Sequence, residues 1–384
     1  MRPGEVRSLL TLVMLAIAAL AGAAAAPADR PGATADSWPL FRGDVRQSGV
    51  SPVALREPLV PAWTFQAGAG IESTAVTSGG IVYVGGLDGV LYAIDLASGA
   101  LRWKYETGQP IKASPSVVDG SVYVGDDAGV FHAVEASTGR RRWVFRTEAA
   151  IVSSATPVGR LIIFGSNDNT VYALSAADGS IGWKVVTGSY VYATPAVLEE
   201  KDGPQLVIAG CDGLLRVLRA RDGAEIRKVE TGGYMGASPA VSGGRAFVGT
   251  FENEFLAVDL RAGTVLWRYE HPDRKFPFYA SAALAGDRVI VAGRDKMVRA
   301  LRQDTGEALW TRSLRGRVDA SPLVAGDRVV AASTAGELVL LDLGTGEPVW
   351  QFDTGAGIAA SPSLAAGRLV IGTTGGMLYA FGGK

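Results

Sequence analysis

The chain has 384 residues, of which 48% are hydrophobic, 20% are charged and 50 are glycine. Glycine at nearly double the roughly 7% of average proteins indicates a globular fold rich in tight turns. The 37 basic and 38 acidic residues nearly cancel, so DNA and RNA binding, which needs a basic surplus, is excluded. With one cysteine, Cys211, and two histidines, the chain cannot form an intramolecular disulfide, a zinc finger, an iron-sulfur cluster or a multi-histidine metal site.

The amino-terminal residues have the pattern of a secretory signal peptide. Arg2 and Arg7 precede an apolar run from Leu9 to Ala26 that ends in alanine and glycine. A charged start, a short apolar centre and small residues at its end are typical of a cleaved export signal rather than of a retained membrane anchor. We predict a signal peptide over residues 1–26, no transmembrane span after cleavage, and a periplasmic or secreted product without a lipid-bearing cysteine.

A repeat of about forty residues fills most of the remaining chain. Its clearest marker is a tryptophan near the end of each unit, replaced once by arginine: Trp63, Trp103, Trp143, Trp183, Arg227, Trp267, Trp310 and Trp350. A glycine lies four residues before each later marker: Gly99, Gly139, Gly179, Gly223, Gly263, Gly306 and Gly346. This regularity predicts a repeat architecture in which the tryptophans pack between neighbouring units and the glycines form turns.

Each unit contains four strand-like segments separated by turns. In the first complete unit these segments are residues 73–76, 81–84, 90–94 and 101–104. Their β-branched and aromatic residues, bounded by glycine turns, are typical of short antiparallel strands. Four strands in forty residues are the signature of one blade of a β-propeller.

The number of blades follows from both ends of the chain. Eight first strands are predicted to begin at Ile71, Ile111, Ile151, Val191, Met235, Phe278, Val318 and Ile358. The last unit contains only three strands, whereas a strand around Trp63 precedes any first strand. We therefore predict an all-β fold: a single eight-bladed propeller of four-stranded antiparallel blades over 61–384, with its last blade closed by the amino-terminal strand. Residues 27–60 form a leader and connecting segment.

The repeat resembles that of the pyrroloquinoline-quinone (PQQ) repeat family. The unit from Ala93 to Trp103 matches the family's A-x-D-x-x-x-G-x-x-x-W motif, and the segment from Trp38 to Val50 is similar to the leader of many PQQ-like propeller proteins. Ser-Pro pairs of the family are matched at Ser114, Ser238, Ser321 and Ser361. The family includes quinoprotein dehydrogenases and the outer-membrane assembly factor BamB, so the resemblance is specific for fold and not for function.

Catalysis is not supported by the sequence motifs. Dehydrogenases of this family hold PQQ against a calcium ion with Glu, Asn and Asp side chains, commonly beside a disulfide that this chain cannot form. The oxygen-rich run Ser166–Asn169 lacks the spaced acidic ligands of a calcium loop. We predict no catalytic residue, no metal ligand and no cofactor; the alternative is a PQQ-dependent dehydrogenase with PQQ and calcium.

One end of the propeller channel is the candidate binding surface. Aromatic residues are concentrated in the loops that lead into the fourth to sixth first strands, and clustered exposed rings beside an arginine are typical of binding surfaces. The alternative is that these rings only fill wider loops. The partner- or ligand-binding candidates are Tyr190, Tyr192, Tyr234, Arg274, Phe276, Phe278 and Tyr279. The channel-mouth candidates are Glu72, Lys112 and Asp319, with an ion pair expected between the first two.

These observations predict an exported, non-enzymatic scaffold that binds protein partners in the bacterial envelope. Its most concrete form is a BamB-like protein that assists the outer-membrane protein assembly machinery. Two other functions remain open: a propeller that binds a carbohydrate or another small ligand, and the PQQ-dependent dehydrogenase. We expect the protein to be a monomer.

Overall fold

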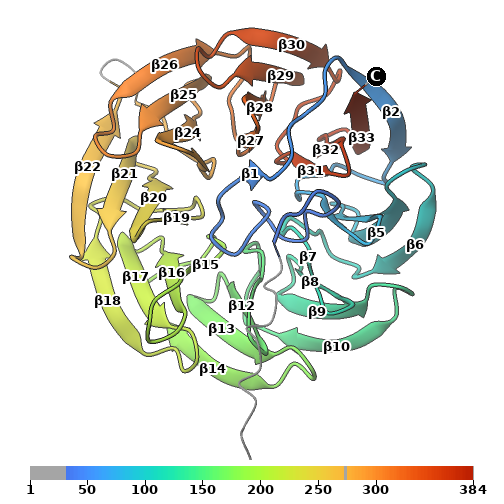
Figure 1. Ribbon diagram of the computed structural model, residues 1–384. Helices are drawn as coiled ribbons and strands as arrows, with labels where there is room; N and C mark the ends of the chain where they lie inside the picture. The colour runs from blue at the N-terminus through green and yellow to red at the C-terminus, as the bar shows by residue number, and fades with distance from the viewer. Residues whose placement is uncertain (1–31, 272–274, 384) are drawn as a thin grey trace, which may run out of the picture. The chain divides into compact units, whose positions relative to one another are not determined.

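The protein is described by a computed structural model that covers residues 32–271 and 275–383. The predicted signal peptide, the first residues after it and Arg274 lie outside these ranges. Within them the strands form eight sheets arranged as blades around a central channel (Figure 1), and no helix is present. Accordingly, no helix in the described ranges could cross a membrane. The predicted all-β, eight-bladed propeller is confirmed.

The blades repeat one antiparallel order from the channel outward. The first blade contains β3 (Val76–Ser78), β4 (Ile81–Gly85), β5 (Val90–Asp95) and β6 (Leu101–Glu106). The second contains β7 (Ser116–Val118), β8 (Ser121–Gly125), β9 (Val130–Glu135) and β10 (Arg141–Arg146). The third contains β11 (Thr156–Val158), β12 (Leu161–Gly165), β13 (Thr170–Ser175) and β14 (Ile181–Val186). The fourth contains β15 (Ala196–Leu198), β16 (Gln205–Ala209), β17 (Leu214–Arg219) and β18 (Glu225–Glu230).

The remaining four blades follow the same plan. The fifth contains β19 (Ala240–Ser242), β20 (Arg245–Gly249), β21 (Glu254–Asp259) and β22 (Thr264–Glu270). The sixth contains β23 (Ala283–Ala285), β24 (Arg288–Ala292), β25 (Met297–Arg302) and β26 (Ala308–Ser313). The seventh contains β27 (Leu323–Ala325), β28 (Arg328–Ala332), β29 (Glu337–Asp342) and β30 (Pro348–Asp353), with the short β1 (Val50–Ser51) parallel to β27. The eighth contains β31 (Ser363–Ala365), β32 (Arg368–Gly372) and β33 (Met377–Gly383), and β2 (Leu59–Gln66) completes it.

The hydrophobic pattern explains the position of each strand within a blade. The central strand β4 reads Ile-Val-Tyr-Val-Gly and is almost wholly buried, because neighbouring blades cover both faces of its sheet. The outer strand β6 instead alternates between exposed and half-buried residues. The apolar cores therefore lie between blades, as in the cluster that joins Val76 and Leu91 of the first blade to Ile111 and Val122 of the second.

A series of hydroxyl groups links the segments that lead into the first strands. The Thr74 N–H donates to the Ser114 hydroxyl over 3.0 Å, and the Ser114 N–H donates in turn to the Ser154 hydroxyl over 3.0 Å. The same bond recurs through Thr194, Ser238, Ser281, Ser321 and Ser361. Because these backbone groups bond to the next blade, β3 begins at Val76 and not at the predicted Ile71 or Ser73, and the other first strands are shortened in the same way.

The repeated tryptophans join the outer parts of the blades, as predicted. The Trp63 indole N–H donates to the Leu96 carbonyl of the following blade over 2.8 Å, and a Cβ placed on Gly99 would lie 2.8 Å from the indole ring. The same bond recurs, at up to 3.2 Å, from Trp103, Trp143, Trp183, Trp267, Trp310 and Trp350. The exception, Arg227, does not reach the equivalent Leu260 carbonyl and instead donates to the carbonyl of Ala262, two residues further on, over 3.5 Å.

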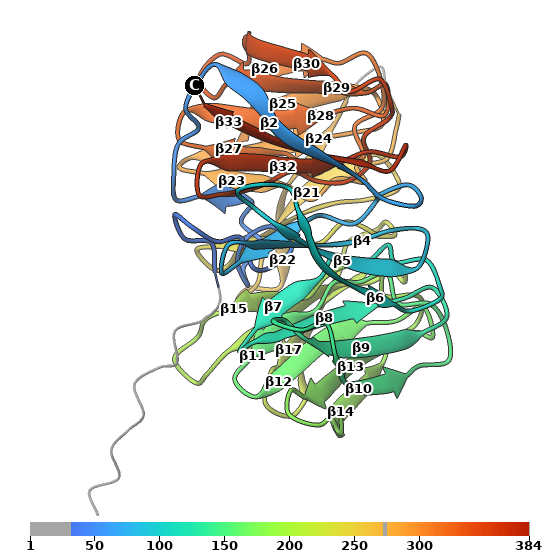
Figure 2. The same cartoon turned by 90° about the vertical axis from the view of Figure 1, so that its right-hand side faces the viewer.

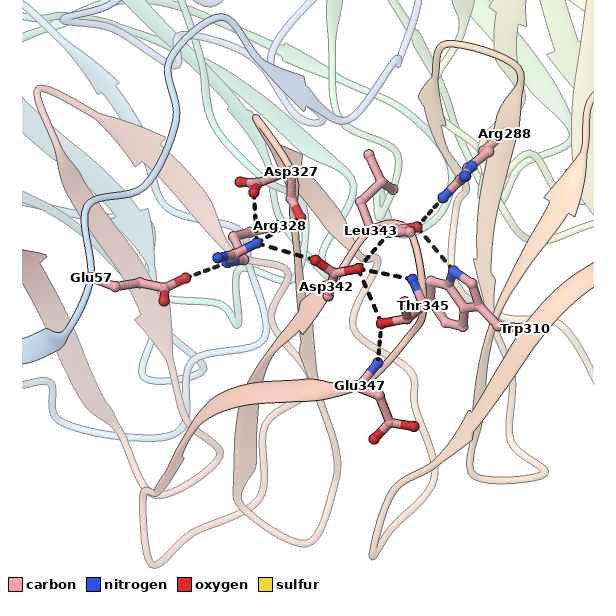
Figure 3. Close-up of polar contacts among 10 residues, drawn as sticks. Glu57, Arg288, Trp310, Asp327, Arg328, Asp342, Leu343, Thr345 and Glu347 are labelled. Atoms are coloured by element: carbon pink, nitrogen blue, oxygen red, sulfur yellow. Dashed lines mark hydrogen bonds and ion pairs between the residues drawn. The ribbon is translucent and has the colours of Figure 1, made fainter.

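The two ends of the chain close the ring. Strand β2 pairs with β33 in an antiparallel register from Leu59 opposite Gly383 to Gln66 opposite Met377. Figure 2 shows the two strands side by side. The predicted closure is confirmed, although the strand begins at Leu59 rather than at residue 61. Just before β2, Glu57 forms an ion pair with Arg328 of β28, which also contacts Asp342 (Figure 3).

Figure 3 also shows polar contacts that join the sixth and seventh blades at a turn. The Leu343 carbonyl, in the turn after β29, accepts hydrogen bonds from the Trp310 indole and the Arg288 guanidinium of the sixth blade (Figure 3). The Asp342 carboxylate accepts bonds from the Thr345 N–H and hydroxyl, at 2.9 and 3.1 Å, and so holds that turn. A polar turn thus supplies the carbonyl on which the tryptophan docks.

Residues 34–51, here called the channel segment, pass around one end of the channel. Backbone bonds join this segment to the innermost part of seven blades, through Thr77, Val117, Val197, Val241, Leu284, Val324 and Ala366. The third blade lacks this bond because Pro157 occupies the matching position of β11 and has no N–H. Arg42 of the channel segment is 1% exposed and donates to the carbonyls of Ser321, Ala282 and Pro322. Burial lowers the pKa of its guanidinium to about 9.

Candidate functional site

The candidate site lies on the face formed by two sets of loops, here called the loop face: the loops that lead into the first strands and the turns between second and third strands. Backbone bonds hold the two sets together. The Cys211 N–H donates to the Tyr190 carbonyl over 3.1 Å, and the Phe251 N–H donates to the Tyr234 carbonyl over 2.8 Å. The channel segment bonds near the opposite ends of the first strands, so it leaves this face uncovered.

Most of the predicted aromatic residues are exposed on the loop face. The exposed fraction is 48% for Tyr190, 56% for Tyr234, 48% for Phe276 and 41% for Tyr279. Tyr192 is half-buried and makes an edge-to-face contact with Tyr190, with ring centroids 5.7 Å apart. Burial raises the pKa of the Tyr192 hydroxyl, and the nearby Cys211, Tyr190 and Tyr279 raise it further. Together these rings form an arc of aromatic side chains along the loops of the fourth to sixth blades.

Phe278 is not part of this surface. It is 3% exposed, and its ring packs edge-to-face against Phe255 and Tyr269. It occupies the position filled by Val318 in the next blade, where a buried apolar side chain anchors the start of the blade. The expectation that Phe278 contacts a ligand is corrected for this reason. Arg274 lies outside the described residues.

Two residues at the site were missed by the sequence analysis. The Phe251 ring stacks on Tyr279 with centroids 4.8 Å apart, and the Arg294 guanidinium lies 3.7 Å from the centre of the Tyr279 ring. Arg294 also donates to both carboxylate oxygens of Asp319, at 2.8 and 3.1 Å. Phe251 and Arg294 occupy the same position of the turn between second and third strands in their blades, so the repeat spacing could have indicated them. The stack fixes Tyr279 at the channel mouth.

The charged residues at the channel mouth pair differently from the prediction. The Lys112 ammonium lies 2.7 Å from Asp127, and not beside Glu72 as expected. The reason is local: the Asp127 N–H donates to the Pro110 carbonyl, which brings the turn of the same blade beside Lys112. Glu72 is exposed, and within the described ranges it forms no ion pair. Asp319 pairs with Arg294.

Two adjoining pockets open beneath the aromatic arc. The first has a volume of about 560 Å³ and is lined by Tyr190, Tyr192, Cys211, Tyr234 and Phe251, among others. The second has a volume of about 440 Å³ and is lined by glycines together with Glu230 and Glu252. Tyr234 and Asp212 line both pockets and form the boundary between them. We call the first the aromatic pocket and the second the acidic pocket.

Two polar side chains that line the aromatic pocket, Cys211 and Asp212, are not chemically reactive. Burial raises the pKa of the Cys211 thiol to about 11, and the thiol donates to the Met235 carbonyl over 3.4 Å. Burial would raise the pKa of Asp212, but hydrogen bonds from Arg216 and the Gly188 N–H lower it. Cys211 is therefore a protonated thiol at neutral pH and Asp212 is a carboxylate already engaged by an arginine, so neither has the character of a nucleophile or a general base.

A calcium-bound quinone does not fit the residues at the channel mouth. Asp127 and Asn167 each have one side-chain oxygen that is buried and unpaired, in the same turn position of adjacent blades. The Lys112 ammonium already neutralises Asp127, and Asn167 carries no charge, so the pair lacks the concentrated negative charge of a calcium site. Across the described residues, no three His, Cys, Asp or Glu side chains are grouped as metal ligands.

The fold and its closure define the class of protein: an eight-bladed β-propeller with tryptophan-docked blades. The family profile described as outer membrane protein assembly factor BamB matches residues 52–190, 167–294, 211–343 and 257–384. These overlapping matches cover most of the chain, and the protein therefore belongs to this family of PQQ-like repeat propellers. No curated protein matches the sequence.

Solved structures with the same fold have different functions. BamB from Moraxella catarrhalis superposes with a TM-score of 0.72 at 18% identity, over 85% of this chain and 100% of that one. Quinohemoprotein alcohol dehydrogenase from Comamonas testosteroni superposes with a TM-score of 0.79 at 15% identity, over 91% of this chain and 81% of that one. At such identities the likeness establishes the fold alone.

Proposed function

We propose that the protein is a non-enzymatic scaffold of the bacterial envelope that binds another protein through its loop face. The observation that carries the proposal is the cluster of exposed aromatic rings, Tyr190, Tyr234, Phe276 and Tyr279, on one face. Exposed aromatic residues grouped beside arginine are enriched in protein interfaces, where each buried ring contributes strongly to affinity. In its finer form, the proposal is a BamB-like role in outer-membrane protein assembly.

Two further observations support a binding role over a redox role. Two cations at the channel mouth, Lys112 and Arg294, are each paired with an aspartate of the protein and are not free to hold an acidic cofactor. The half-buried thiol and the engaged carboxylate of the pocket floor do not provide a catalytic base.

The experiment is a capture of envelope proteins on the purified mature protein. We expect a defined partner to be retained by the native protein, lost from the double variant Tyr190→Ser/Tyr234→Ser, and kept by Leu101→Ser. Leu101 is 47% exposed on the outer strand β6, away from the loop face, and it controls for a general loss of exposed apolar surface. Equal retention by all three proteins would contradict the proposal.

Calorimetric titration with PQQ, with and without calcium, separates the scaffold from the dehydrogenase. We expect no heat of binding and no shift in melting temperature. Saturable binding at one site, with reduction of a dye in the presence of an alcohol or a sugar, would replace the scaffold with an enzyme.

A further inference from the structure

We infer that the adjoining aromatic and acidic pockets bind an extended segment of a partner protein in which lysine or arginine alternates with aromatic or other apolar residues. This inference rests on the proposed function and adds to it the chemistry of the partner. It follows from two neighbouring surfaces of different character that share the Tyr234 side chain.

The acidic pocket has unbalanced negative charge. The two arginines nearest to it are already engaged, Arg216 by Asp212 and Arg268 by Glu254. Glu230 and Glu252 both line the pocket and are exposed. In the part of the chain that the structure describes, neither forms an ion pair, and Lys228 lines neither pocket. A cationic side chain of the partner would neutralise them.

The Glu252 carboxylate lies close to the backbone of the Tyr234 loop. A Cβ placed on Gly233 would lie 2.5 Å from Glu252 Oε2, so the absence of a side chain at Gly233 lets the carboxylate lie directly against the loop. The exposed carboxylate therefore lies beside the loop that carries Tyr234. Negative charge and aromatic surface are presented together, which suits a lysine or arginine that also contacts a ring.

The aromatic pocket offers rings and hydroxyl groups, and its one charged side chain is already paired. Asp212, its one carboxylate, accepts both bonds from Arg216 over 3.0 and 2.6 Å. The rings of Tyr190, Tyr192, Tyr234 and Phe251 remain as the contact surface. Aromatic-lined pockets of this kind accept tryptophan, proline or aliphatic side chains from an extended peptide. An acidic segment would instead face the repulsion of Glu230 and Glu252.

The experiment measures the fluorescence anisotropy of three short, capped and labelled peptides against the full mature protein. The first alternates lysine with tryptophan; the second has glutamate in place of lysine; the third has serine in place of tryptophan. We expect the first to bind at least about tenfold more tightly than either control peptide, with an affinity that falls as salt is added.

Variants of the protein assign this binding to the two pockets. We expect Tyr234→Ala to weaken the first peptide about tenfold, and Glu230→Gln/Glu252→Gln to weaken it about fivefold and reduce its salt dependence. The matched controls are Leu101→Ala, an exposed apolar residue of β6 outside both pockets, and Glu307→Gln, an exposed carboxylate in the turn before β26. Both should bind within about twofold of the native protein.

The outcomes separate this inference from the proposed function. Equal binding of the basic and acidic peptides, unchanged binding by Tyr234→Ala, or binding of an oligosaccharide in place of all three peptides would overturn the inferred partner chemistry. If envelope capture still depends on Tyr190 and Tyr234 in that case, the scaffold role stands without it. If capture is also unchanged in the Tyr190→Ser/Tyr234→Ser variant, both proposals fail.

Discussion

The Arg42 guanidinium donates a 2.5 Å hydrogen bond to the carbonyl of Pro322, which lies 280 residues further along the chain. The same guanidinium bonds to the carbonyl of Ala282 over 3.0 Å. One side chain of the channel segment thus ties the sixth and seventh blades to the amino-terminal part of the protein. A buried cation whose hydrogen bonds go only to carbonyl groups is sensitive to substitution, because each lost donor leaves a buried acceptor unpaired.

Substitution of Arg42 should therefore destabilise the propeller. We expect Arg42→Ala to lower the free energy of unfolding by about 2 to 4 kcal/mol, through the unpaired carbonyls and the cavity that it leaves. Denaturant unfolding followed by tryptophan fluorescence measures the effect. The control is Arg46→Ala in the same segment, whose side chain is 57% exposed and should change stability by no more than about 0.5 kcal/mol. An unchanged midpoint for Arg42→Ala would show that the channel segment does not stabilise the ring through this side chain.

The glycine against each docked tryptophan should tolerate no side chain. At Gly306 the backbone φ is +75°, and a Cβ would lie 2.6 Å from the Trp267 ring. At Gly79 the φ is +58° and nothing lies within 4 Å. We expect Gly79→Ala to cost about 1 to 2 kcal/mol from backbone strain alone, and Gly306→Ala to cost about 1 to 3 kcal/mol more from overpacking. Thermal unfolding of the two variants checks this, and equal losses would rule out the contribution of the ring.

A tryptophan at position 227, the one blade junction that lacks it, should stabilise the propeller. Arg227 contacts the Ala262 carbonyl at 3.5 Å, whereas the tryptophan at the next junction bonds to the Gln303 carbonyl at 3.0 Å. We expect Arg227→Trp to raise the free energy of unfolding by about 0.5 to 2 kcal/mol, as substitutions toward a repeat consensus do. Trp267→Arg is the reciprocal change and should lower it. A destabilised Arg227→Trp protein would mean that this junction has a different spacing.

Alkaline stability should depend on Tyr83. Burial raises the pKa of this hydroxyl from 10.0 to about 12, and it donates to the Ala136 carbonyl of the next blade. In the unfolded chain the hydroxyl loses its proton near pH 10, so the stabilisation is fully present below that pH and is lost as the pH rises toward about 12. As the pH rises from 10 to about 12, the Tyr83→Phe variant should lose less stability than the native protein. Parallel pH profiles would contradict this assignment.

Most of the fold could be predicted because its determinants are local and repeated. The spacing of Trp63, Gly99 and Trp103 reflects one indole docking on one turn, and seven copies of that arrangement, with Arg227 at the eighth junction, define the blades. The start of the first strands could not be placed in the same way. Thr74 bonds to a hydroxyl of another blade, so its β-forming sequence does not become part of the sheet.

The candidate site was only partly predictable, because its side chains do not recur at the same position in every blade. The loop sequence around Phe278 does not distinguish a core ring from a surface ring, since an aromatic residue there can replace the buried valine or isoleucine of other blades. Phe251 and Arg294 could be found only by aligning the turns of all eight blades and looking for large side chains. The channel segment has no periodic counterpart, so its contacts with seven blades required the structure.

Ring closure also sets the order in which the molecule can be completed. The Gln66 amide at the end of β2 bonds to the carbonyl of Gly375, 309 residues later. A ribosome that adds about 5 to 20 residues per second needs about 15 to 60 s to make that stretch. Strand β2 is thus among the first parts to be synthesised and the last to find its partner. Until then the blades can form only an open arc, and the chain must remain without its final contact through most of its own synthesis.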